Sequence, residues 1–141
     1  MGFVYERKIN YYETDKMGIT HHSNYIRYME EARIAWLDSI GFGYKKMEEL
    51  GVISPVVEVN SRFAKISTFD DVLLITVNLI KYTGTQFLIE YSMVNKETSQ
   101  LICKSSSLHC FVNENGRPIR IGATYPEIDN LLKDMLVTDG E

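Results

Sequence analysis

The chain has 141 residues, of which 45% are hydrophobic and 24% charged, and its formal net charge at pH 7 is -4. This length suits one domain with its own core, so we expect a single domain over residues 1–141. The negative charge argues against nucleic acid as the main partner, because phosphate binding usually needs a basic surface. The start of the chain lacks the apolar core of a signal peptide, and no apolar run is long enough to span a bilayer. We therefore expect a cytoplasmic protein that binds neither nucleic acid nor a membrane.

The first part of the chain predicts a strand, a polar loop, a long helix and a short helical turn, over residues 3–12, 13–23, 24–40 and 44–50. Ser23 or Asn24 can cap the start of the long helix, and Gly41 can end it. Ile26 and Ile34 widen its apolar stripe, which indicates a helix enclosed by other elements rather than one lying on a surface.

The second part of the chain is rich in strand patterns separated by turn residues. It predicts a run of strands, which begins at residue 54 and continues over residues 72–82, 87–93, 100–112 and 117–121. Pro126 and the apolar residues after it predict a C-terminal helix. Because helix and strands are segregated, we expect an α+β fold in which an antiparallel sheet wraps around one long central helix.

The cysteine and histidine residues do not indicate a disulfide or a metal site. Cys103 and Cys110 lie seven positions apart on one predicted strand and face opposite sides, so we expect two free thiols. His109 on the same strand is interpreted as a hydrogen-bonded structural residue. His21 and His22 are adjacent in a loop, where we expect their side chains to point apart, and no third ligand follows at zinc spacing. We expect no metal and no cofactor.

The loop before the long helix combines two features that catalysis can use. Asp15 is an isolated carboxylate between two rigid elements, where site residues tend to lie. The first N–H groups of a helix lack internal partners and carry partial positive charge. Taken alone, Asp15 is more often a turn residue that accepts hydrogen bonds from local N–H groups.

The residues of this region resemble a known enzyme family. Four of them match the motif of 4-hydroxybenzoyl-CoA thioesterases in type and spacing, namely Asp15, Gly18, Asn24 and Tyr25. His22 matches a histidine of the related Tol–Pal-associated bacterial acyl-CoA thioesterases. Further similarity lies in Glu30-Glu31-Ala32-Arg33 and in the block from Arg62 to Leu73. The resemblance covers residues 3–121 and implies a hotdog fold.

The resemblance also implies the activity, which is hydrolysis of an acyl-CoA thioester to free acid and CoA. Asp15 would attack the thioester carbonyl or activate a water molecule, and the backbone N–H of His22 would donate to the oxyanion. Asn24 and the His22 side chain would be supporting polar groups of the catalytic site. The expected substrate-binding residues are Gly18, Tyr25, Arg62 and Lys65, of which the last two could bind CoA phosphates.

Relatives with this fold form dimers with a continuous sheet, often paired into tetramers, and their active sites lie between subunits. We therefore expect a homo-oligomer, either a dimer or a homotetramer built as a dimer of dimers. Two alternatives remain: a thioesterase acting on acyl carrier protein, or a non-catalytic acyl-CoA-binding module. Met17 and His21 depart from the family pattern, and this leaves the acyl group open.

Overall fold

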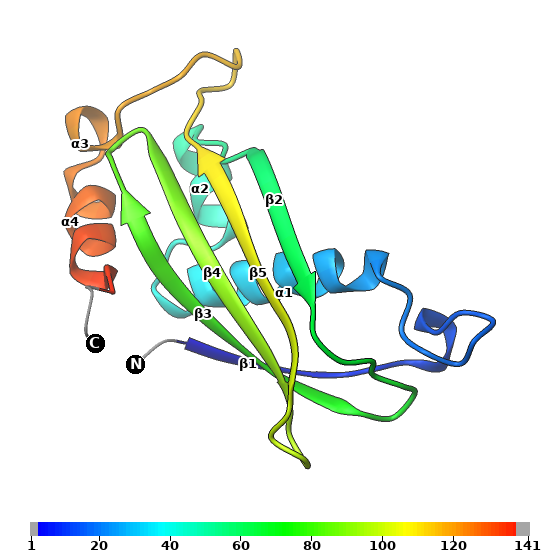
Figure 1. The fold of residues 1–141 in the computed structure, drawn as a ribbon. Helices are drawn as coiled ribbons and strands as arrows, with labels where there is room; N and C mark the ends of the chain where they lie inside the picture. Colours follow the sequence, from blue (N-terminus) through cyan, green and yellow to red (C-terminus); the bar gives the residue numbers. More distant parts are fainter. Residues whose placement is uncertain (1–2, 138–141) are drawn as a thin grey trace.

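The computed structural model describes residues 3–137 and contains one five-stranded antiparallel sheet with the strand order β1-β3-β4-β5-β2 (Figure 1). Its strands are β1 (Phe3–Lys8), β2 (Val56–Phe63), β3 (Val72–Tyr82), β4 (Gln86–Asn95) and β5 (Leu101–Cys110). The two edge strands, β1 and β2, are the ones that flank the long helix in the sequence. The loops at both ends of that helix therefore lead to opposite edges of the sheet.

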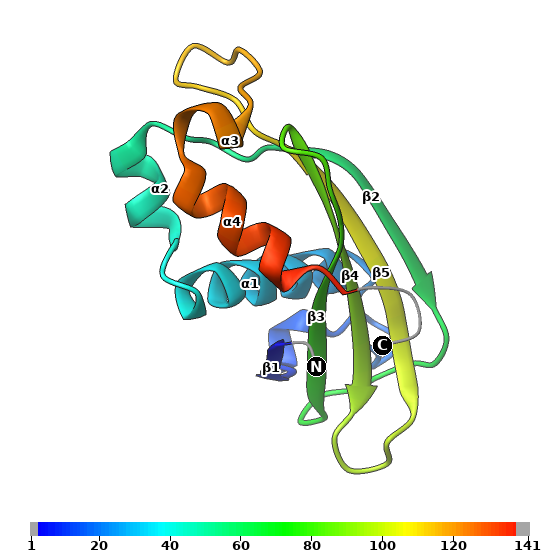
Figure 2. The same ribbon diagram turned by 90° about the vertical axis from the view of Figure 1, so that its left-hand side faces the viewer.

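The helices lie on one face of this curved sheet, as Figure 2 shows. They are η1 (Tyr11–Glu13, a 3-10 turn), α1 (Ser23–Ser39), α2 (Tyr44–Leu50), α3 (Ile121–Thr124) and α4 (Pro126–Met135). The inward side chains of β3 and β4 alternate strictly with outward ones and are fully buried against α1. The largest of the helix residues that meet them are Tyr28 and Trp36. This confirms the predicted α+β class with a sheet around a central helix.

The start of the chain differs from the predicted strand over residues 3–12. Strand β1 ends at Lys8, and residues 11–13 form the 3-10 turn, so Tyr11 is 71% exposed instead of continuing the inward row. The alternation of apolar residues continues through the turn, and the sequence pattern therefore does not reveal where the sheet pairing stops. The turn redirects the chain away from β3 and towards the start of α1.

Three further details of the elements were predicted incorrectly. Helix α1 begins at Ser23, so Asn24 lies inside its first turn and neither residue caps it; the Asn24 side-chain amide donates to the carbonyl oxygen of Glu13. Ile26 and Ile34 are exposed in the single chain, since the sheet covers only one side of α1. Residues 117–121 form no strand; only an isolated bridge joins Val112 to Pro118.

Two smaller predictions, on the cysteines and on His109, are confirmed. Cys103 and Cys110 are both free, and the first is buried. His109 is fully buried and hydrogen bonded to the Ser107 hydroxyl at 2.7 Å. Within residues 3–137, no helix is both long and apolar enough to cross a membrane.

Candidate functional site

The loop that contains Asp15 is tightly structured by its own backbone. The Asp15 N–H donates to the carbonyl of Ile19 at 2.8 Å, and the Gly18 N–H donates back to the carbonyl of Asp15 at 2.9 Å. Gly18 has a φ of +80°, in the left-handed region that side chains disfavour. One carboxylate oxygen of Asp15 accepts from the Met17 N–H at 2.8 Å. The glycine therefore allows a narrow turn that presents the carboxylate on its outer side.

Asp15 borders a cavity of about 300 Å³. The lining comes from the Asp15 loop, from the start of α1, and from the end of β2 with the segment after it. It comprises Asp15, Met17, Ile19, Thr20, His22, Tyr25, Phe63, Ala64, Lys65 and Ile66. Most of these side chains are apolar, so the cavity suits an apolar group with a polar end at Asp15. Larger hollows exist elsewhere, but they do not contain Asp15.

The helix start lies at the same cavity. His22 is the residue that immediately precedes α1, and it lines the cavity together with Asp15. The hydrogen bonds of residues 3–137 include none donated by its backbone N–H, while the N–H groups of His21, Ser23 and Asn24 all have acceptors. A free N–H at the positive end of a helix is suited to bind a developing negative charge.

The remaining predicted site residues divide into two groups. Gly18 shapes the loop, while Tyr25 and Lys65 line the cavity with Asp15 and His22. Asn24 and Arg62 are not among the lining residues: Asn24 is turned towards Glu13, and Arg62 precedes Phe63 on the exposed strand β2. The roles proposed for these residues stay predictions.

The histidine rings differ from the prediction that they point apart. The rings of His21 and His22 are stacked, with centroids 4.3 Å apart. The Nδ1 atom of His21 also accepts from the N–H of Ser23, so His21 substitutes for a conventional helix cap. His22 in turn faces the edge of the Phe63 ring at 6.3 Å.

Buried hydroxyl groups connect the cavity floor to the segment after β2. The Tyr25 hydroxyl lies 2.6 Å from the Ser67 hydroxyl, which lies 2.7 Å from that of Thr20. Burial raises the pKa of Tyr25 above its ordinary value, so its phenol stays protonated near neutral pH. A protonated phenol is not suited to remove a proton, so Tyr25 contributes a ring and a hydrogen-bonded hydroxyl to the cavity lining.

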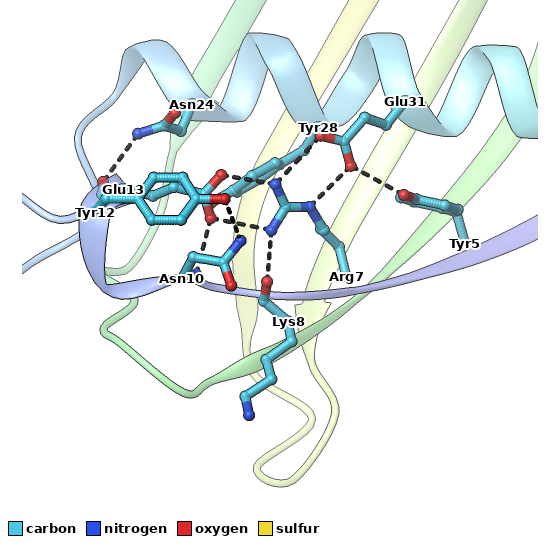
Figure 3. Close-up of polar contacts among 9 residues, drawn as sticks. All are labelled: Tyr5, Arg7, Lys8, Asn10, Tyr12, Glu13, Asn24, Tyr28 and Glu31. Atoms are coloured by element: carbon cyan, nitrogen blue, oxygen red, sulfur yellow. Dashed lines mark hydrogen bonds and ion pairs between the residues drawn. The ribbon is translucent and has the colours of Figure 1, made fainter.

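Sequence reasoning missed the residue that organises the loop, which is Glu13. Its carboxylate is 6% exposed and is bound by both terminal nitrogens of Arg7, at 2.6 and 3.0 Å (Figure 3). The Tyr28 hydroxyl and the Asn10 N–H also donate to it, at 3.0 and 2.8 Å. Burial alone would raise the pKa of Glu13, but these donors outweigh it and keep the pKa below its ordinary value. The signal in the sequence was a charged residue at the start of the predicted loop, two positions before Asp15.

Comparison with known proteins agrees with this arrangement. Residues 9–134 match the family profile described as the Thioesterase-like superfamily. A protein of Aquifex aeolicus (strain VF5) named "Putative esterase" is 36% identical over 95% of this chain and 100% of its own length. The "Putative acyl-CoA thioesterase YneP" of Bacillus subtilis (strain 168) is 33% identical over 86% of this chain and 88% of its own.

A solved structure extends the similarity to the fold. The DHNA-CoA thioesterase from Staphylococcus aureus superimposes with a TM-score of 0.88 at 28% identity, covering 93% of this chain and 88% of that one. The chain is thus a hotdog-fold protein of the thioester-hydrolase class. It belongs to the Thioesterase-like superfamily, and the resemblance seen in the sequence is confirmed.

Proposed function

We propose that this protein hydrolyses acyl-CoA thioesters in the cavity bordered by Asp15. The observation that carries the proposal is that one cavity is lined by both Asp15 and His22, the residue that precedes α1 and whose backbone N–H has no acceptor among residues 3–137. The relatives named above as thioesterases support CoA as the carrier. Asp15 would either attack the thioester carbon, expelling CoA thiolate and leaving an anhydride for water to cleave, or remove a proton from the attacking water.

The other cavity residues have complementary roles in this proposal. The His22 N–H would donate to the oxyanion, a contribution of about 3 kcal/mol to the transition state for one such donor. Tyr25 and Phe63 would enclose the acyl group near the carbonyl. Lys65, at the rim, would be available to the phosphates of CoA.

The test is release of free CoA thiol from a panel of aliphatic and aromatic acyl-CoAs by wild type and by Asp15→Asn. We expect turnover to fall by about 100- to 10,000-fold in the variant, the usual contribution of a positioned acid–base group. Asp134→Asn is the matched control, since Asp134 is exposed on α4 and should leave turnover unchanged. Wild-type rates in Asp15→Asn would remove this residue from the mechanism.

Failure of the wild type on every CoA ester would direct the test to acyl carrier protein substrates. If these are not cleaved either, a binding assay with non-hydrolysable acyl-CoA decides whether the protein is a non-catalytic binding module. Binding without turnover in the presence of an intact Asp15 would support that alternative.

We also propose that the protein is a homo-oligomer, with a second copy at the free edge of β2. This strand pairs only with β5 within residues 3–137. Its exposed apolar side chains, between 37% and 52% accessible, are Val56, Val57, Val59 and Phe63. An apolar open edge of this kind favours pairing with another strand. Phe63 lines the cavity, so a copy placed there would add its own residues to the site.

Sedimentation tests the oligomer against the chain mass of 16.3 kDa. We expect a species of two or four chains in wild type, and a shift towards one chain in Val59→Lys. The control is Val4→Lys, which places the same charge on the other edge strand at a similarly exposed valine. A wild-type monomer at micromolar concentration would contradict the proposal. The choice between dimer and tetramer is read from the same experiment.

A further inference from the structure

We propose that Glu13 is a positioning residue, which sets the distance between the Asp15 carboxylate and the His22 N–H. The inference rests on the proposed function and deepens it, because it names the group that aligns the two reacting parts of the site. Glu13 lies outside the cavity and touches no substrate; it acts through the loop whose two ends it joins.

The first step is that Glu13 is fixed to the body of the protein. Arg7 of β1 binds its carboxylate with both terminal nitrogens, and the same guanidinium binds Glu31 of α1 through Nε at 2.8 Å. The guanidinium also lies over the Tyr28 ring, 4.7 Å from its centroid. Figure 3 shows these groups converging between β1 and α1. A bidentate Arg–carboxylate pair restricts both distance and orientation.

The second step is that the backbone of Glu13 fixes both ends of the catalytic loop. Its carbonyl oxygen accepts from the His21 N–H at 2.9 Å and from the Asn24 side-chain amide at 2.8 Å. His21 directly precedes His22, while Asp15 follows Glu13 by two residues. One buried residue thus connects the Asp15 arm and the helix start through bonds of ordinary length.

The third step is that this geometry controls rate. The nucleophile or base and the oxyanion donor must both be aligned with the same substrate carbonyl group. A displacement of about 1 Å can lower the rate by about 100-fold. Loss of the Glu13 charge would release the turn at residues 11–13 from Arg7 and allow both arms to move. We therefore expect Glu13→Gln to lower kcat by roughly 10- to 100-fold with little change in KM.

The matched control is Glu31→Gln. Glu31 accepts from the same guanidinium, but it belongs to α1 and has no bond to the loop at residues 14–22. In that variant Arg7 keeps both contacts to Glu13. Glu13→Gln should lose more stability than Glu31→Gln, because Glu31 is 35% exposed. When rates are corrected for the folded fraction measured by circular dichroism, only Glu13→Gln should lose kcat. Equal loss of kcat in both, or wild-type kcat in Glu13→Gln, would overturn the proposal.

A second readout does not depend on turnover. Amide hydrogen exchange at His21, whose N–H donates to Glu13, should become at least tenfold faster in Glu13→Gln than in Glu31→Gln. If the wild type hydrolyses no thioester, the proposed function fails while this measurement still decides whether Glu13 orders the loop. Unchanged exchange at His21 in Glu13→Gln would overturn the positioning role even in an active enzyme.

Discussion

Replacement of Arg7 by Met tests the ion pair on which the loop depends. The substitution keeps an unbranched apolar stem but removes every guanidinium contact to Glu13 and Glu31. Breaking a buried pair by deleting one partner costs about 3–5 kcal/mol, because the remaining charge is left uncompensated. The side chains of Arg7 and Glu13 are 16% and 6% exposed, which places this pair in that class. Glu31 is 35% exposed, so its contact adds little, and we expect a loss of about 3 kcal/mol at pH 7.

The assay is urea unfolding of both proteins at one fixed protein concentration, because association would otherwise contribute to the apparent stability. In the wild type the pKa of Glu13 is below its ordinary value, so the pair stabilises above the unfolded-state pKa and this stabilisation is lost as pH falls through the folded pKa. In Arg7→Met the orphaned carboxylate should instead have a raised pKa. Its penalty is then relieved by protonation, and the difference between the proteins shrinks from pH 7 to pH 5.

Lys96→Met provides the control for this experiment. It removes the ion pair between Lys96 and Glu6, in which both side chains are 55% exposed. Such surface pairs contribute about 0–1 kcal/mol. An Arg7→Met loss as small as that of Lys96→Met, or one that does not change with pH, would refute the reasoning about a buried charge.

Two further predictions concern stability. Burial, aided by the charge of Arg33, lowers the pKa of His109 to about 4, so as pH falls the unfolded chain binds a proton at this residue before the folded chain does. The free energy of unfolding should therefore fall by up to about 3 kcal/mol as pH drops from about 6.5 to 4. Urea unfolding across that range should show this pH-dependent loss in the wild type and not in His109→Gln. In Gly18→Ala the new Cβ has no atom within 4 Å, so only the positive φ of this residue opposes the substitution. Thermal unfolding should show that the free energy of unfolding falls by about 1–2 kcal/mol. A fall of more than about 3 kcal/mol would indicate a steric clash, which the structure does not contain.

The sequence predicts best those helices and strands whose ends are set by their own residues and by the turn or cap residues next to them. Strand β3 matches the prediction at both ends, because its run of apolar and β-branched residues lies between two turn segments. Helix α2 and its terminating glycine at residue 51 also follow from local pattern. Strand β1 was extended too far, since the point at which pairing with β3 stops depends on a partner about 65 residues away. The alternation of apolar residues in residues 3–12 does not show where pairing with β3 ends.

The sequence predicted only those residues of the candidate site that lie close together in the chain. Asp15, His22 and Tyr25 were found together because one loop and one helix start contain them. The other lining residues, 63–66, come from the end of β2 and the segment after it, and reach the cavity through tertiary structure. Asn24 illustrates the converse error: its type and position suggested a helix cap, but the helix begins one residue earlier, and the Asn24 amide donates to the carbonyl of Glu13.

The two carboxylates of this loop lie two residues apart, and their contacts suit the different roles proposed for them. Glu13 accepts four hydrogen bonds, two of them from Arg7, and is thereby fixed and unreactive. In the described part of the chain, the Asp15 carboxylate accepts one hydrogen bond, from the backbone N–H of Met17, and no cation forms an ion pair with it. A carboxylate that is paired with a cation is a weaker base and nucleophile, because its charged form is stabilised. By engaging Arg7, Glu13 leaves the loop rigid while Asp15 keeps an oxygen available for chemistry.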